Sequence, residues 1–180
     1  RPTSGEISIN GIDIKVDRRA AMSTVGTVIE TPEFYPEFTP ADGLIYVGRM
    51  YGMSDRDIEN RAREVLEDVK MWEWRDKPIG KFSKGMRQRV MIAQAMLPDP
   101  EILIFDEPTS GLDPRGMIEM RELLNGLKKR GLTLVISTHM LKEVSEMCTQ
   151  VTMINKGRTV ISGDVNSLLR NTSDNISTIN

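Results

Sequence analysis

Short apolar runs separated by polar turns define most of this chain. Buried strands are predicted around residues 25–32, 102–105 and 133–138, where valine, isoleucine and leucine dominate. The run 102–105 is continuously apolar, which is typical of a parallel strand buried on both faces. Alternating residues on either side of Asn10-Gly11 predict a hairpin, and a second hairpin is predicted across Lys156-Gly157.

Helical spacing dominates three other parts of the chain. Residues 41–74 have a helical texture, and Ser54 with Asp57 resembles a capping box at the start of an amphipathic helix. A second helix is predicted over 84–97, before the Pro-Asp-Pro segment. The leucines and methionines after Asp113 predict an amphipathic helix that Gly131 caps, and a short helix is expected over 141–147.

Strands and helices that alternate at short spacing predict an α/β fold with a mainly parallel sheet. The mostly helical stretch 39–97 is expected to be a subdomain inserted into that sheet. The predicted organisation is then N-terminal strands and a loop at 1–38, the helical subdomain at 39–97, the core at 98–165 and a polar tail at 166–180.

Composition narrows the class of protein. The chain has 180 residues, 39% of them hydrophobic, which is ample for a buried core. A net charge of -2 gives no electrostatic indication of a nucleic-acid partner. The single cysteine excludes an internal disulfide framework and fits a reducing cytosol. No apolar run reaches the roughly 18 residues that a membrane span needs, and no signal peptide is recognised.

Asp106 and Glu107 directly follow the apolar run 102–105. Ionised carboxylates are costly to desolvate unless something compensates them. Ligands of parallel sheets bind at the carboxyl ends of the strands, where such a pair suits magnesium and phosphate chemistry. One carboxylate holds Mg²⁺ and the other orients or deprotonates an attacking water. The alternative is that both are ordinary solvated acids in a turn.

Two neighbouring segments favour the chemical interpretation. Ser83 and Gly85 precede a basic helix and place backbone amides and a hydroxyl at its positive end, which is an anion site. Lys84 there could instead belong to a solvated face. His139, the only histidine, follows the strand 133–138 and is a candidate to contact a terminal phosphate, although a lone histidine is more often structural.

The order of these motifs resembles the ATP-binding cassette (ABC) ATPases, over nearly the whole chain. The motifs are Ser-x-Gly-x-x-Gln-Arg, apolar-Asp-Glu-Pro-Thr-Ser-Gly-Leu-Asp and Ser-Thr-His. The resemblance implies ATP and Mg²⁺ as ligands, Asp106 as the magnesium residue, Glu107 as the catalytic base and His139 as the switch histidine. It also implies a signature loop of Ser83, Lys84, Gly85 and Met86, and a D-loop from Ser110 to Asp113.

The resemblance further implies a P-loop NTPase-like fold and a set of partners. Two nucleotide-binding subunits would close head-to-tail on ATP, each signature loop completing the site of its neighbour. The loop before the helical subdomain would meet an integral-membrane permease. The protein would accordingly be cytoplasmic and peripheral on the inner face of the cell membrane.

The sequence departs from the family pattern in two motifs. Glu30 stands where the Q-loop usually has glutamine, and its carboxylate can still bind a magnesium-bound water. The signature reads Phe-Ser-Lys-Gly-Met instead of the commoner Leu-Ser-Gly-Gly-Gln, so Ser83 and Gly85 are kept and Lys84 adds a cation near the phosphate position. Together with Glu-x-Pro-x-Phe-Tyr-Pro at 30–36, this resembles the branch that serves exporters of antibiotic peptides and similar amphipathic compounds.

The phosphate-loop pattern Gly-x-x-x-x-Gly-Lys-Ser/Thr does not occur in the 180 residues. In this family that loop lies just upstream of the opening Arg-Pro-Thr-Ser-Gly, so the chain is expected to be a piece of a longer protein. The phosphate loop supplies several backbone amides and a lysine to the nucleotide. Losing three charge-assisted hydrogen bonds of this kind would remove about 4.5 to 9 kcal/mol of nucleotide-binding free energy. The 180 residues alone are therefore expected not to hydrolyse ATP, and to leave apolar sheet surface uncovered.

Two other functions compete with a transporter subunit. A soluble ABC ATPase acting on ribosomes or DNA usually carries tandem cassettes, long coiled coils or basic extensions, whereas this chain is mildly acidic. A degenerate cassette could serve as a non-catalytic scaffold. The presence of Asp106, Glu107 and His139 favours a catalytic protein over that scaffold.

Overall fold

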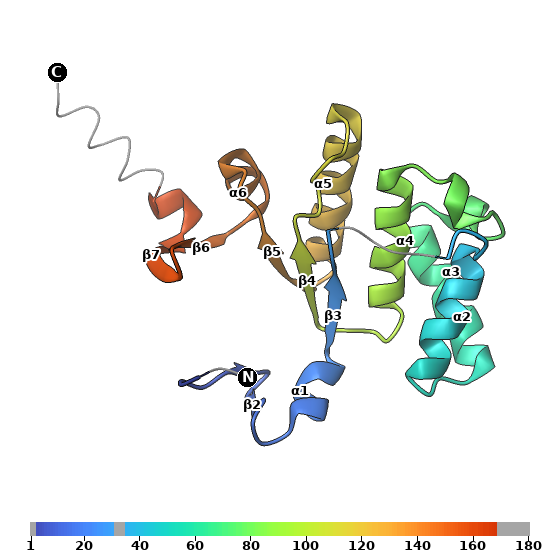
Figure 1. Cartoon of the computed structure of the whole chain (residues 1–180), viewed down its shortest axis with the longest axis horizontal. Helices are drawn as coiled ribbons and strands as arrows, with labels where there is room; N and C mark the ends of the chain where they lie inside the picture. The colour runs from blue at the N-terminus through green and yellow to red at the C-terminus, as the bar shows by residue number, and fades with distance from the viewer. Residues whose placement is uncertain (1–2, 31–34, 169–180) are drawn as a thin grey trace. The chain divides into compact units, whose positions relative to one another are not determined.

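The computed structural model describes residues 3–30 and 35–168 (Figure 1). The chain divides into two compact units, Arg1–Ser137 and Thr138–Asn180, which are described in turn. The four-part division predicted from the sequence stays a prediction, and most of its tail at 166–180 lies outside the described residues.

The first unit begins with the predicted hairpin. Strands β1 (Ser8–Ile9) and β2 (Ile12–Asp13) pair antiparallel across Asn10 and Gly11. Both turn residues have positive φ, 50° and 78°, as a two-residue hairpin turn requires. Helix α1 (Arg18–Ser23) follows and was not predicted, because six residues are too few to show a helical period.

A parallel sheet forms the centre of the first unit. It contains β3 (Val25–Val28), β4 (Ile102–Asp106) and β5 (Thr133–Ser137), in that order. Val28 pairs with Phe105, and Asp106 pairs with Ser137. Within the described residues this confirms the predicted strands and the α/β fold with a parallel sheet, and the carboxyl ends of β4 and β5 meet at one edge.

The two faces of the sheet differ in burial. Leu103 and Phe105 of β4 are fully buried on one face. On the other face Ile104 is 38% exposed and Val135 of β5 is 51% exposed. The prediction that the strand at 102–105 is buried on both faces is therefore wrong for this chain, because no described segment of the first unit covers the second face. The uncovered apolar sheet surface expected from the sequence is present there.

The helical subdomain lies between β3 and β4 in the sequence, as predicted (Figure 1). Thr39 and Asp42 form a capping box at the start of the first helix, and Ser54 caps the second by accepting from the Asp57 amide. Its elements are α2 (Pro40–Met50), α3 (Asp55–Asp68), the short 3-10 helices η1 (Trp72–Trp74) and η2 (Ile79–Lys81), and α4 (Lys84–Met96).

Helix α4 joins the subdomain to the sheet. The buried residues of α4 include Val90, Ile92 and Ala93. A Cβ at Gly26 of β3 would lie 2.6 Å from the Ala95 carbonyl oxygen, so only glycine allows this close approach. The helix that carries the signature sequence is thereby fixed directly against the sheet.

Helix α5 (Pro114–Lys129) connects β4 with β5. Its buried side chains fall at helical spacing, as the sequence predicted. Gly131, at a φ of 95°, donates its amide to the Lys128 carbonyl oxygen and ends the helix as expected. The buried side chains are Met120, Leu123, Leu124 and Leu127.

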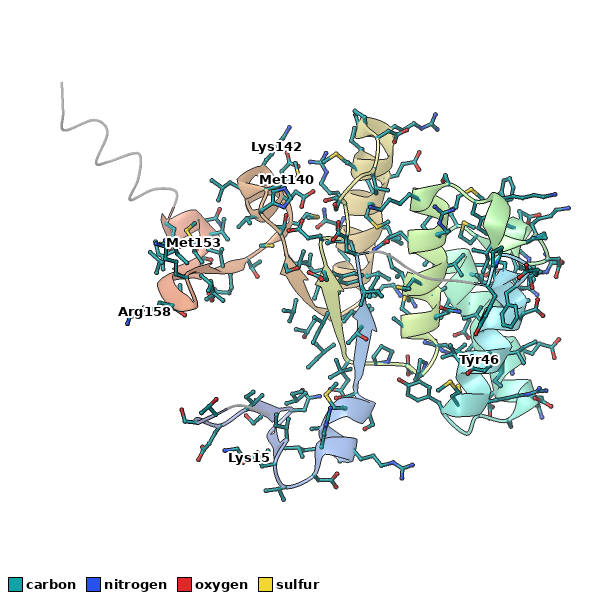
Figure 2. All side chains as sticks on the ribbon, viewed as in Figure 1. Lys15, Tyr46, Met140, Lys142, Met153 and Arg158 are labelled. Atoms are coloured by element: carbon teal, nitrogen blue, oxygen red, sulfur yellow. The ribbon has the colours of Figure 1, made fainter. Side chains whose placement is uncertain are left out.

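The second unit contains α6 (Leu141–Met147), β6 (Gln150–Asn155) and β7 (Arg158–Asp164). The two strands pair antiparallel across Lys156 and Gly157, which confirms the second predicted hairpin. Figure 2 shows the side chains of Met153 on β6 and Arg158 on β7, and Met153 is 43% exposed.

Apolar side chains are exposed on the subdomain as well as on the sheet. Tyr46 of α2 points outward with 61% of its surface exposed, and Met50 is 71% exposed (Figure 2). Among the helices of the described part of the chain, none combines the length and the apolar character that a membrane crossing demands.

Candidate functional site

The acidic pair lies at the carboxyl edge of the sheet. Asp106 is the last residue of β4 and is exposed, and Glu107 follows it half-buried. The Ser137 hydroxyl, at the end of β5, donates to Asp106 Oδ1 at 2.5 Å. Because a carboxylate has two oxygens, this bond orients Asp106 and leaves the other oxygen able to bind a metal.

Glu107 has an unusual backbone conformation. Its φ of 47° lies in the left-handed region, which is energetically costly for a residue with a side chain. Its amide donates to the Ser137 carbonyl oxygen at 3.1 Å and lies 3.3 Å from the Ser137 hydroxyl oxygen. These bonds to β5 hold the strained backbone and fix the direction in which the Glu107 side chain leaves the strand.

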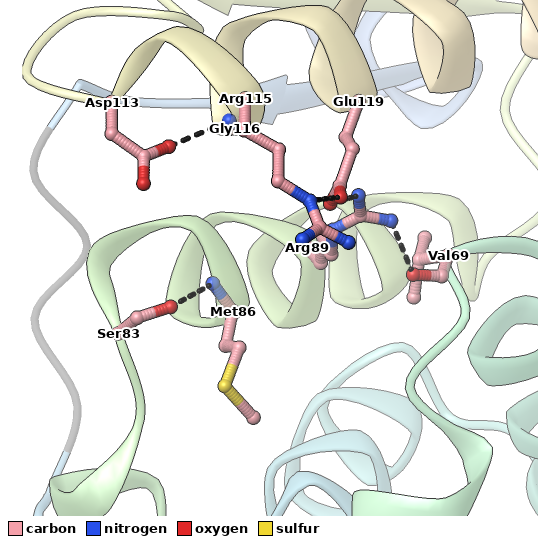
Figure 3. A network of polar contacts seen from close by, with 8 residues as sticks. All are labelled: Val69, Ser83, Met86, Arg89, Asp113, Arg115, Gly116 and Glu119. Atoms are coloured by element: carbon pink, nitrogen blue, oxygen red, sulfur yellow. Dashed lines mark hydrogen bonds and ion pairs between the residues drawn. The ribbon is translucent and has the colours of Figure 1, made fainter.

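The signature residues begin helix α4. Ser83 is the N-cap, and its hydroxyl oxygen accepts from the Met86 amide at 3.2 Å (Figure 3). A hydroxyl that accepts one hydrogen bond still has its own proton to donate. The helix start therefore combines a hydroxyl donor, backbone amides and the positive end of the helix dipole, which is an arrangement that favours an anion.

A second helix start lies beside the first. Asp113 is the N-cap of α5 and accepts from the Gly116 amide at 2.6 Å. Figure 3 shows Ser83 and Asp113 at the same end of the two helices. Further along, Arg89 of α4 donates to Glu119 of α5 at 3.1 Å, so the two helices are joined along their length.

The turn 110–113, which connects the acids to α5, contacts two other predicted site residues. The Ser110 hydroxyl donates to Glu30 Oε1 at 2.7 Å. A Cβ at Gly111 would lie 2.8 Å from Lys84 Nζ, so the lysine side chain covers this glycine. A Cβ at Gly85 would lie 3.7 Å from Leu112.

The structure thus brings several predicted residues together around one turn. The turn meets Glu30 and Lys84, and its Ser110 amide donates to the Glu107 carbonyl oxygen at 3.0 Å. The described hydrogen bond of Glu30 goes to Ser110, and the role of Glu30 as a metal ligand stays a prediction. Asp113 caps α5, and its contact with a nucleotide stays a prediction too.

His139 belongs to the second unit and is exposed. It follows the end of β5 by two residues, next to Thr138, whose hydroxyl donates to the buried Glu143 at 2.8 Å. The Met140 amide donates to the Thr138 hydroxyl oxygen at 3.1 Å, so the chain around His139 is ordered by its neighbours. The predicted contact of His139 with a terminal phosphate stays a prediction.

The donor set around Asp106 fits magnesium better than a metal held wholly by protein. The described ranges contain no group of three or more His, Cys, Asp or Glu residues placed to hold a metal ion. Mg²⁺ usually keeps several waters and takes one or two carboxylates together with phosphate oxygens. An exposed, oriented aspartate such as Asp106 can supply that kind of ligand.

A cavity of about 340 Å³ lies away from the acids. It is bordered by Ile102 and Thr133 at the amino ends of β4 and β5, and by Arg61 and Arg130. The acids are at the opposite ends of the same strands. The candidate site is consequently defined by the carboxyl edge and the turn 110–113, and this cavity is separate from it.

Sequence reasoning did not predict three contacts that organise the site, although the residues that make them lie in the quoted motifs. Ser137 was part of a quoted motif, but its bond to Asp106 depends on the pairing of β4 with β5. The contact of Ser110 with Glu30 joins positions 80 residues apart. The role of Arg89 in joining α4 to α5 shows only when the helices are packed. The one available signal was a serine at the end of the strand next to the acids.

Comparisons with known proteins place these motifs in a family. Residues 1–110 match the sequence pattern of the family described as "ABC transporter". The bacitracin transport ATP-binding protein BcrA of Bacillus licheniformis is 40% identical over 159 residues, covering 88% of this chain and 51% of that protein. The Nod factor export ATP-binding protein I of Burkholderia lata is 34% identical over 168 residues, covering 93% of this chain and 55% of that protein.

A solved structure supports the same assignment. The protein cbiO1 from Clostridium perfringens, described as part of the ABC transporter complex cbiONQ, has a TM-score of 0.84 and 29% identity. The match covers 96% of this chain and 70% of that one. The chain spans about half the length of the curated relatives it matches, 51% and 55% in the two cases above. Its α/β fold is that of the ABC ATPase structures, and the chain belongs to the ABC transporter family.

Proposed function

We propose that this chain is part of the nucleotide-binding subunit of an ABC transporter, in which ATP binding and hydrolysis drive transport through a membrane permease. The observation that carries the proposal is the arrangement of Asp106 and Glu107 at the end of β4, both held by Ser137. The names of the relatives, which refer to transport and export ATP-binding proteins, support the transporter role.

The two acids and His139 then have these chemical roles. Asp106, oriented by Ser137, is the protein ligand for Mg²⁺. When bound, Mg²⁺ neutralises charge on phosphate oxygens. Glu107 accepts a proton from the attacking water, and its fixed backbone sets the direction of the carboxylate. His139 contacts the terminal phosphate from beyond β5.

The signature residues serve the nucleotide of a second subunit. Ser83 donates its hydroxyl proton to a phosphate oxygen while its oxygen still caps α4. Lys84 adds a positive charge and the Gly85 backbone amide faces the same anion, while the Met86 amide donates to the Ser83 hydroxyl oxygen. A head-to-tail pair of subunits brings this surface to the partner's ATP, and Asp113 ends the turn between the two sites.

The membrane partner is a permease, and the protein acts on the cytoplasmic face of the membrane. Residues 31–34 of the loop that would meet the permease lie outside the described residues. In the described part of this loop, Tyr35 and Phe38 form a ring pair with centroids 5.2 Å apart. Export of an amphipathic compound, such as an antibiotic peptide, is the transport that the names of the bacitracin and Nod factor relatives support.

The proposal is tested by ATP hydrolysis in the full-length protein combined with its permease in lipid vesicles. We expect magnesium-dependent hydrolysis that the permease stimulates. Glu107→Gln should lower the rate by about 10²- to 10⁴-fold, the usual contribution of a general base. The matched control is Glu122→Gln, an exposed glutamate on α5. Equal rates for both variants would refute the catalytic role, and hydrolysis without any response to the permease would favour a soluble ATPase.

A further inference from the structure

We propose that Glu30 and Lys84 are positioning residues that clamp the turn 110–113 onto its own chain from two sides. The proposal rests on the proposed function to the extent that this turn faces a second subunit. The clamp itself is a property of the single chain, and it can be measured without nucleotide, permease or partner subunit.

Glu30 forms one side of the clamp. Its Oε1 accepts from the Ser110 hydroxyl at 2.7 Å, across 80 positions of sequence. A carboxylate forms a stronger hydrogen bond with a hydroxyl than a neutral amide does, because the acceptor is charged. The same serine donates its amide to the Glu107 carbonyl oxygen at 3.0 Å. Ser110 therefore connects the side chain of Glu30 to the backbone of Glu107, the proposed catalytic base.

Lys84 forms the other side. Its terminal atoms cover Gly111, where an added Cβ would lie 2.8 Å from Nζ, 3.5 Å from Cδ and 3.6 Å from Cε. Gly111 has a φ of 64°, a conformation that glycine adopts without strain. Glycine at this position thus serves both the backbone turn and the close approach of the lysine. Leu112 extends the contact toward Gly85.

The two sides are related by charge and by sequence. Glu30 and Lys84 carry opposite charges and contact the adjacent residues Ser110 and Gly111. They are also among the site positions at which this sequence departs from the family pattern, since glutamine is usual at position 30 and glycine at position 84. An acid and a base that replace two neutral residues around one turn leave its net charge unchanged and add a contact on each side.

Amide hydrogen exchange in the nucleotide-free, full-length protein tests the Glu30 side. The amides of Ser110 and Leu112 report on the turn because they donate to the carbonyl oxygens of Glu107 and Thr109. We expect Glu30→Ala to speed their exchange about twofold to tenfold, the range for one hydrogen bond of ordinary strength. Glu30→Gln keeps an acceptor oxygen and should restore most of the protection. Glu37→Ala, at another exposed glutamate, should change nothing.

The Lys84 side is tested with the same readout. Lys84→Ala should speed exchange of the turn, whereas Lys84→Met should retain much of the protection because the Cδ and Cε positions also cover Gly111. Lys81→Ala is the matched control, an exposed lysine three residues earlier. The clamp is supported if Lys84→Ala speeds exchange of the turn and Lys81→Ala does not. Equal exchange rates in the two alanine variants would overturn the proposed role of Lys84.

A double variant separates the clamp from a general loss of folding. Ser110→Ala removes the donor and should act like Glu30→Ala, and the combination should be no faster than either single variant. Additive effects would overturn the proposal, as would Glu30→Gln exchanging as fast as Glu30→Ala. Because exchange is measured without ATP, the two proposals fail separately. Unchanged exchange in the variants would overturn the clamp, whereas absence of ATP hydrolysis in the wild type would overturn the proposed function.

Discussion

Ser137 Oγ lies 2.5 Å from Asp106 Oδ1, so the serine that ends β5 orients the acid that ends β4. The same serine receives the Glu107 amide on its carbonyl oxygen. One residue thereby fixes both proposed catalytic acids, through its side chain for Asp106 and mainly through its carbonyl oxygen for Glu107. The pairing of the two parallel strands makes this possible, because it sets Asp106 directly beside Ser137.

Replacing Ser137 should affect the two acids differently. Ser137→Ala keeps the bond from the Glu107 amide to the carbonyl oxygen of residue 137. It loses the short hydroxyl bond to Asp106 and the longer one, 3.3 Å, from the Glu107 amide to the hydroxyl oxygen. For an exposed hydrogen bond we expect a loss of about 1 kcal/mol, which is roughly a fivefold lower rate of ATP hydrolysis. Ser137→Thr keeps the hydroxyl and suits a strand, so it should retain the rate. Steady-state kinetics at varied magnesium check this, and equal rates for the alanine and threonine variants would contradict it.

Arg89 should contribute more to stability than its neighbour Arg115. The Arg89 side chain is 11% exposed and bonds the Val69 carbonyl at 3.0 Å and Glu119 at 3.1 Å (Figure 3). Arg115 bonds Glu119 at 2.9 Å and is 88% exposed. Arg89→Ala should lower the free energy of unfolding by about 2 kcal/mol, because it leaves the carbonyl oxygen of the buried Val69 without this hydrogen bond. Arg115→Ala should cost less than about 0.5 kcal/mol.

Urea unfolding of the full-length protein measures both changes. The hydrogen bond from Arg115 is the largest cause that lowers the pKa of Glu119, with attraction to Arg89 a smaller one. Burial nevertheless favours Arg89 as the stabilising residue, since solvent screens the exposed pair. A larger loss from Arg115→Ala than from Arg89→Ala would refute this order.

Gln88 is a polar residue within the apolar face of α4. Its side chain is 2% exposed, and neither amide atom has a hydrogen-bond partner in the described part of the chain. An unsatisfied buried polar group costs roughly 1 to 3 kcal/mol. Gln88→Met, of similar volume, should raise the free energy of unfolding by about 1 kcal/mol. A loss of stability in the same urea experiment would show that the amide has a structural role.

The capping box of α2 should give an acid-dependent contribution to stability. The Thr39 hydroxyl donates to Asp42 at 2.7 Å and the Thr39 amide at 3.0 Å, and these bonds lower the pKa of Asp42. Because the pKa is lower in the folded protein, the contribution is present above the ordinary value of 3.8 and is lost as pH falls through the folded value.

Thr39→Ala tests this effect. It should raise the pKa of Asp42 toward 3.8 and cost about 1 kcal/mol near neutral pH, as loss of an N-cap usually does. An NMR titration of the Asp42 carboxyl group follows the first change, and urea unfolding the second. Ser54→Ala, which removes the cap of α3, is the control and should leave Asp42 unaffected. An unchanged Asp42 pKa in Thr39→Ala would contradict the account.

The sequence was sufficient for the elements that carry a strong pattern. The apolar runs and turn residues predicted β3, β4, β5 and both hairpins, and the position of Asp106 at a strand end followed from them. Helix α1 was missed because its six residues show no period. The apolar run 102–105 wrongly predicted burial on both faces, because such a run indicates strand character and cannot show which faces of a sheet are covered. The exposed sheet surface at Ile104 followed instead from the missing phosphate-loop pattern.

The contacts that organise the site could not be predicted in the same way. The bond between Ser110 and Glu30 and the cover of Lys84 over Gly111 depend on how distant segments pack. Local propensity carries no information about such distances. The motifs therefore identified the residue types of the site, whereas the structure was needed to show that Glu30 and Lys84 contact the same turn.

The central claim is that Glu107 acts in hydrolysis and not in nucleotide binding. The most direct test measures ATP binding and ATP turnover in the same preparation of full-length protein, for the wild type and Glu107→Gln, with magnesium present. The account predicts that the variant binds ATP within about threefold of the wild type and hydrolyses it at least about 100-fold more slowly. Turnover that survives the substitution, or binding that falls as far as turnover, would contradict it.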